Sequence, residues 1–104
     1  MMGIDVDRTV VPAGNVTFQV RNASQETIHE MLVAPVNSRG AKLPYIADEN
    51  RVDEDATGHL GEVSELDPGK KGSLTLDLKP GLYVLFCNVA GHFSQGMWRT
   101  IEVR

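Results

Sequence analysis

The chain has 104 residues, of which 41% are hydrophobic and 23% charged, so it is expected to form one domain, residues 1–104, with one core. Its formal charge is -4 and its Lys and Arg residues form no basic stripe, which argues against nucleic acid as a partner. No apolar run approaches the roughly 20 residues that a membrane helix requires, so no membrane insertion is expected. The Met-Met-Gly start lacks the features of a signal peptide, which indicates a cytoplasmic protein or a mature form.

The first third of the chain is typical of strands joined by turns. Residues 4–11 are expected to form a strand that ends at the turn Pro12-Ala13-Gly14. Residues 16–21 alternate apolar and polar side chains, the period of a half-buried strand. A polar loop follows at residues 22–26, and residues 27–34 are expected to form another strand, which Pro35 should end.

His29 lies near the start of this last strand, on the same side as Met31 and Val33. Such a histidine either occupies a hydrogen-bonded niche in the core or binds a metal through a neutral imidazole. From the strand alone the core interpretation is favoured, and the two interpretations both remain open.

Residues 37–61 are the least regular part of the sequence. Residues 43–46 could pack as a short element, and the acidic residues between 48 and 55 favour a short helix or a surface loop. Such a charge run is most often a solvated face, and the alternative is a docking patch for a basic partner. His59 lies between Gly58 and Gly61 in this loop region and is expected to be a surface histidine rather than a ligand.

Strand patterns return from Val63 to the end of the chain. Turns are expected at residues 66–70 and 79–81, with alternating leucines between them at Leu74, Leu76 and Leu78. Residues 82–87 are apolar on both faces and should form a central strand, and residues 98–103 should form the closing one. In all, about seven to eight strands predict an all-β fold, a β-sandwich or a small barrel, of which a Greek-key β-sandwich is the expected form. A Greek-key crossing would bring His29 beside the strand that ends at Cys87.

The loop after this central strand holds Cys87, His92 and Met97 in the spacing Cys-x4-His-x4-Met. A single cysteine excludes an internal disulfide, and a lone cysteine by itself is more often a small buried hydrophobe than a ligand. Thiolate, imidazole and thioether together, however, suit copper better than magnesium or calcium. With His29 as the second nitrogen donor, the four residues predict a trigonal site for one copper ion, with Met97 as a weaker axial ligand.

At these residues the sequence resembles the type 1 (blue) copper proteins, or cupredoxins, the family of plastocyanin and azurin. The resemblance covers Pro-Ala-Gly-Asn-Val-Thr-Phe, the segment up to His29, Lys-Pro-Gly-Leu-Tyr-Val-Leu-Phe-Cys, Gly-His-Phe-Ser-Gln-Gly-Met and the final Ile-Glu-Val. The loop spacing is most similar to that of rusticyanin and sulfocyanin. By matched position the resemblance implies that His29, Cys87, His92 and Met97 bind copper. Two positions depart from the family: Glu30, where Asn or Ser is common, and Trp98, where a small residue is common.

The resemblance implies an electron carrier rather than an enzyme. It would pass one electron on Cu(I)/Cu(II) between redox proteins, such as cytochromes or oxidases and reductases, which dock transiently near His92. The docking patch is expected to comprise Val89, Ala90, Phe93 and Pro35. The family also implies a monomer in the periplasm or another extracytoplasmic compartment.

Three alternatives remain open at this stage. One is a copper carrier or sensor with an exchangeable site, although two of the four methionines, Met1 and Met2, are terminal. Another is a non-blue mononuclear copper site that includes Glu30. The last is a metal-free, immunoglobulin-like sandwich.

Overall fold

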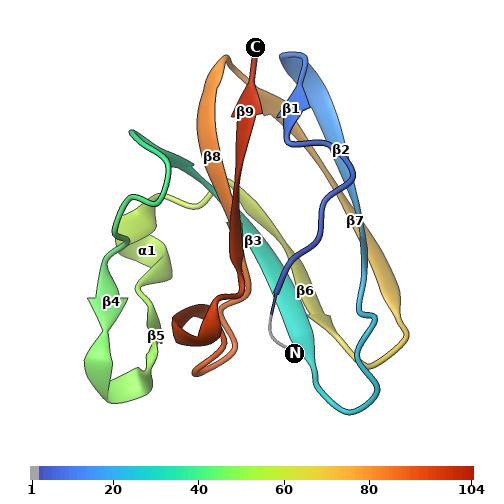
Figure 1. Ribbon diagram of the computed structural model, residues 1–104, viewed down its shortest axis with the longest axis vertical. Helices are drawn as coiled ribbons and strands as arrows, with labels where there is room; N and C mark the ends of the chain where they lie inside the picture. The colour runs from blue at the N-terminus through green and yellow to red at the C-terminus, as the bar shows by residue number, and fades with distance from the viewer. Residues whose placement is uncertain (1–2) are drawn as a thin grey trace.

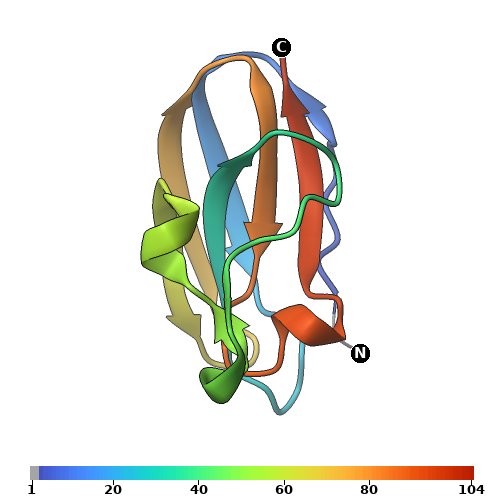
Figure 2. The ribbon, with the colours of Figure 1, turned by 90° about the vertical axis from the view of Figure 1, so that its left-hand side faces the viewer.

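The computed structural model describes residues 3–104, so Met1 and Met2 lie outside the described residues. Two sheets face each other as a sandwich (Figures 1 and 2). The larger sheet has the strand order β1-β9-β8-β3-β6, and the smaller pairs β2 with β7. The strands are β1 (Val10–Val11), β2 (Gly14–Arg21), β3 (His29–Val36), β6 (Gly61–Leu66), β7 (Lys71–Leu78), β8 (Gly81–Phe86) and β9 (Trp98–Val103). The all-β sandwich predicted from the sequence is confirmed.

A small hairpin lies beside the larger sheet and raises the number of strands above the expected seven or eight. It pairs β4 (Tyr45–Ile46) with β5 (Arg51–Val52), and with it the described residues hold nine strands. A 3-10 turn, η1 (Ala47–Glu49), connects the two strands, and the single-turn helix α1 (Glu54–Thr57) follows β5. The side chain of Asp53 caps α1 by accepting a hydrogen bond from the Ala56 amide. The acidic region is therefore an ordered element rather than a plain loop.

Apolar side chains cover both faces of the larger sheet. Between the sheets, buried residues such as Met31, Leu85 and Ile101 pack against the inward side chains of β2 and β7. On the outer face, Leu32, Val84 and Phe86 pack against Val52 of the hairpin. Strands β3 and β8 are thus buried on both faces, which confirms that residues 82–87 include a central strand.

Two strand predictions need correction. Within residues 4–11 only Val10 and Val11 form a strand, because Ile4 and Val6 pack against the core without pairing in a ladder. Strand β3 also continues through Pro35 to Val36 instead of ending before the proline. Its pairing with β6 ends at Val33, so beyond that residue β3 is paired only with β8, and the missing N–H of Pro35 can be accommodated there.

The predicted crossing between β3 and β8 positions the candidate site. The two strands pair antiparallel from Leu32↔Phe86 to Val36↔Leu82, so the start of β3 lies next to the end of β8. The β8–β9 loop, which contains the 3-10 turn η2 (Phe93–Gln95), lies at this same end of the sandwich, at the bottom of Figure 1. None of the helices among residues 3–104 is long and apolar enough to cross a membrane.

Candidate metal centre

Cys87 follows directly after β8 and is completely buried. Its amide donates a hydrogen bond to the carbonyl oxygen of Met97 over 3.1 Å, so the two ends of the loop are joined at the thiol. Its Sγ atom accepts a hydrogen bond from the amide of Glu30, at the start of β3, over 3.4 Å. Cys87 is therefore held twice, by its backbone to the end of the loop and by its sulfur to β3.

The rest of the loop is fixed by its own backbone. The amide of His92 donates to the carbonyl of Val89, and the carbonyl of His92 accepts from the amide of Met97. Gly91 and Gly96 have φ values of 82° and 100°, which side chains of L-residues rarely adopt. Both glycines therefore allow tight turns just before His92 and Met97, which are both buried.

Three donor atoms converge at this end of the sandwich. The Nδ1 atoms of His29 and His92 are 3.2 Å apart, and they lie 3.9 Å and 3.4 Å, respectively, from the Sγ atom of Cys87. The circle through these three atoms has a radius of about 2 Å, close to the bonds of about 2.0–2.3 Å that histidine nitrogen and thiolate sulfur make with an ion such as Zn²⁺. One small ion would thus fit in the plane of the three atoms.

Burial sets the protonation states that such an ion requires. The pKa of both His29 and His92 is lowered, first of all by burial, and for His29 also by the neighbouring His92 ring, which favours neutral imidazoles with a free lone pair. Burial raises the pKa of the Cys87 thiol, while backbone N–H groups of Glu30 and Val89 act against this effect. A bound cation would deprotonate the thiol, so cation binding and proton release are coupled here.

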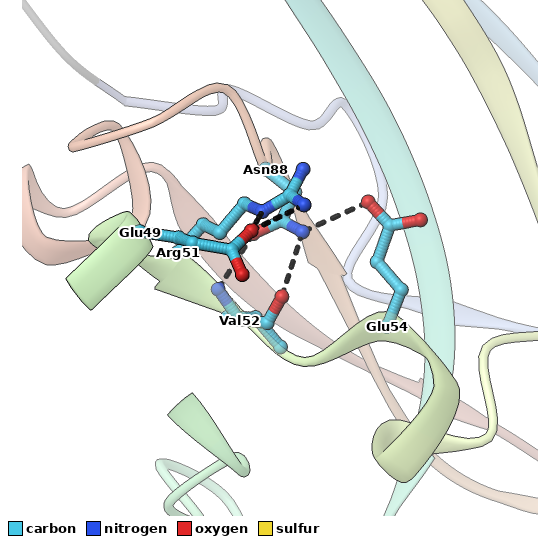
Figure 3. A network of polar contacts seen from close by, with 5 residues as sticks. All are labelled: Glu49, Arg51, Val52, Glu54 and Asn88. Atoms are coloured by element: carbon cyan, nitrogen blue, oxygen red, sulfur yellow. Dashed lines mark hydrogen bonds and ion pairs between the residues drawn. The ribbon is translucent and has the colours of Figure 1, made fainter. Parts of the chain in front are cut away.

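Asn88 connects the β8–β9 loop, named the metal loop because it contains Cys87, His92 and Met97, to the β4–β5 hairpin (Figure 3). The sequence did not reveal this contact. This buried side chain accepts a hydrogen bond from the amide of Val52 and donates one to its carbonyl, over 2.8 Å and 2.9 Å. It also donates to a carboxylate oxygen of Glu54. The Gly91 amide adds a bond to the carbonyl of Asn50. The irregular region 37–61 thus includes a brace for the metal loop.

The two departures from the family pattern have structural explanations. The Glu30 backbone amide contacts Cys87 Sγ, a link between the two segments that does not depend on which side chain follows His29. The Glu30 carboxylate is not among the donor atoms that converge at Cys87, and it lines an acidic groove instead. Trp98 is 39% exposed and lies beside Phe93, with 6.4 Å between the ring centroids, so it does not fill the core.

Among known proteins, no family model and no curated sequence matches the chain. Several solved structures, however, match the chain. The sodium-dithionite-reduced auracyanin of the photosynthetic bacterium Roseiflexus castenholzii superposes with a TM-score of 0.72 and 22% identity, over 96% of this chain and 86% of that one. Auracyanin B gives a TM-score of 0.67 and 20% identity over 100% of this chain and 78% of that one. The chain has the cupredoxin fold.

Rusticyanin shares this cupredoxin fold, in a longer chain. The protein from Thiobacillus ferrooxidans superposes with a TM-score of 0.68 and 19% identity over 91% of this chain, which spans only 59% of rusticyanin. The expected resemblance to cupredoxins is therefore confirmed for the fold.

The donor set of this cupredoxin fold fits one copper ion. Two imidazole nitrogens and a thiolate in one plane, with a thioether nearby, are the donors of an electron-transfer copper site, whereas magnesium and calcium prefer oxygen. Met97 is 5% exposed and is joined to both Cys87 and His92 through its backbone, so the residue lies at the same end of the sandwich as the three donor atoms. The ligand role of each residue remains a prediction.

Proposed function

We propose that this protein carries one electron at a time on a single copper ion held by His29, Cys87, His92 and Met97. The observation that carries this proposal is the triangle of Nδ1, Nδ1 and Sγ atoms, whose center lies about 2 Å from each donor. A bound copper ion would supply the Cu(I)/Cu(II) couple. The similarity to auracyanin and to rusticyanin, each of which has been solved in a reduced state, supports a redox role.

The chain's own residues favour electron transfer over exchange of the metal. Cys87 is completely buried and His92 is 7% exposed, so water has little access to these two residues, and His29 is partly exposed. The loop is held by backbone hydrogen bonds at Cys87, His92 and Met97, which limits movement of the ligands when the charge changes. A small rearrangement between the two charge states makes one-electron transfer fast.

Redox proteins are proposed to dock where His92 approaches the surface. Val89 and Phe93 are half-buried and Ala90 is exposed beside this residue, which gives a mainly apolar contact of the kind that suits weak, transient docking. The expectation that Pro35 belongs to this patch is wrong, because Pro35 lies near the far end of β3, opposite Tyr83. The proposed compartment is extracytoplasmic, by resemblance to the family.

One optical experiment tests the proposal. The protein loaded with Cu(II) should show an intense visible absorption band that disappears on reduction and returns on oxidation. Cys87→Ser should abolish the band, because the thiolate is the donor that produces it. His59→Gln replaces a histidine outside the centre and should leave the band unchanged.

Several outcomes would contradict electron transfer at this centre. If Cys87→Ser retained the band, the ligand assignment would be wrong. If a chelator removed Cu(I) within seconds, a carrier or sensor of copper would be favoured. An electron paramagnetic resonance spectrum of a non-blue site that changed in Glu30→Gln would favour the alternative in which Glu30 is a ligand.

A further inference from the structure

A second group of metal-binding side chains lies outside the candidate copper centre. Glu54 of α1, His59 of the following loop and Glu62 of β6 each offer one donor atom, and these atoms all lie within 4.8 Å of one another. The sequence predicted only a surface histidine at position 59. The fold instead brings an imidazole between two carboxylates from different elements.

The arrangement of these side chains differs from that of a simple acidic cluster. The Nδ1 atom of His59 lies 3.3 Å from the backbone carbonyl of Glu54, and because a carbonyl oxygen only accepts, the neutral ring would carry its proton on Nδ1 and its lone pair on Nε2. Metal-binding histidines usually have this pattern, with one ring nitrogen bound to a carbonyl and the other to the metal. Asn88, which is 2% exposed, holds one carboxylate oxygen of Glu54 over 2.8 Å and leaves the other free.

Glu54 and Glu62, two of the three residues, also line a negatively charged groove, whereas His59 is not among its lining residues. This groove has a volume of about 570 Å³ and is lined by Glu54 and Glu62 together with Glu30 and Glu65. The cation among its lining residues is Arg51, which pairs with Glu49. The groove therefore gives a hydrated cation both access and a favourable electrostatic potential.

We propose that Glu54, His59 and Glu62 bind one divalent transition-metal ion, such as Zn²⁺, independently of the copper centre. One nitrogen and two carboxylate oxygens are ligands that zinc accepts, with water in the fourth position. Tetrahedral bonds of about 2.1 Å place ligand atoms about 3.4 Å apart, so donors that lie within 4.8 Å of one another must approach by at most about 1.4 Å. Rotation of the exposed Glu62 side chain can supply this movement.

Nitrogen-15 spectra of the histidine rings can test this site directly. Zinc is added to the Cu(I)-loaded protein at about pH 7.5, where an ordinary histidine is mainly neutral. The proposal expects the Nε2 resonance of His59 to move to the position of a metal-bound nitrogen at one equivalent of zinc. His29 and His92 report on the other centre separately, so zinc that binds there instead is recognised by the shift of their resonances.

Two glutamates of β6 provide a matched pair of variants. Glu62→Gln removes a proposed ligand, whereas Glu65→Gln removes the same charge from the same groove. Zinc affinity at His59 should fall at least about tenfold in Glu62→Gln and less than about threefold in Glu65→Gln. Magnesium should leave the His59 resonance in place.

The proposal would be overturned by any of three results. One is an unchanged His59 resonance at about 1 mM zinc. Another is an equal loss of affinity in the two glutamine variants, which would indicate only diffuse attraction by the groove. The third is an equal response to magnesium, which would show that the imidazole is not a ligand.

Discussion

Replacing Asn88 with alanine should destabilise the metal-free protein strongly. The substitution removes the partners of the Val52 amide and carbonyl, and Val52 is 1% exposed, so water cannot easily replace them. Each buried backbone group left unpaired costs about 1–3 kcal/mol, so for the two groups we expect a loss of about 2–6 kcal/mol in the free energy of unfolding. For a domain of this size the melting temperature should fall by about 10 °C or more.

Urea denaturation of the metal-free protein measures this loss, with an unchanged m-value as the sign of two-state behaviour. Asn37→Ala, at an exposed asparagine, is the control and should change the free energy by less than about 0.5 kcal/mol. Asn88→Asp keeps the shape and the acceptor but places a carboxylate beside Glu54 and the Val52 carbonyl, so it should be no more stable than the alanine variant. A loss below about 1 kcal/mol in Asn88→Ala would refute the claim that the hydrogen bonds between Asn88 and Val52 stabilise the fold.

Two further predictions concern Glu30 and Gly91. Burial, and then Glu54, Glu62 and Glu65, raise the pKa of Glu30 to about 7, so its ionisation destabilises the metal-free fold as the pH rises from below 4.5 through about 7. Glu30→Gln should therefore match the wild type at about pH 4.5 and be more stable at about pH 8, by about 1 kcal/mol because the side chain is only half-buried. Equal stability at both values of pH would contradict this. Gly91→Ala should lower the free energy of unfolding by about 1–3 kcal/mol because of its positive φ. Gly40→Ala is the control, because Gly40 has a similar positive φ but a Cβ there would have no neighbour within 4 Å. A Cβ at Gly91 would instead lie 3.3 Å from the side-chain amide nitrogen of Asn50. A smaller loss at Gly91 than at Gly40 would show that this contact does not matter.

Much of the fold could be predicted because its signals are local. The alternation in β2 and β7 and the apolar run before Cys87 reflect how each strand is buried. The turn residues mark where the strands end. The two wrong strand predictions concern segments in which pairing with a neighbouring strand, and not the local pattern, determines the structure. Residues 4–9 have strand-like alternation without a ladder partner, and Pro35 is tolerated because β3 has lost its β6 neighbour there.

The sequence by itself determined which donor atoms are available and which of them share a loop. Cys87, His92 and Met97 lie within eleven residues, and their chemistry already indicates a soft metal. The structure places His29 beside Cys87, as the predicted crossing implied, whereas only the tertiary structure decided that Asn88 contacts Val52 and that His59 lies close to two glutamates. The physical reason is that spacing along a chain fixes local geometry, whereas contacts over tens of residues depend on how the strands pair and how the sheets pack.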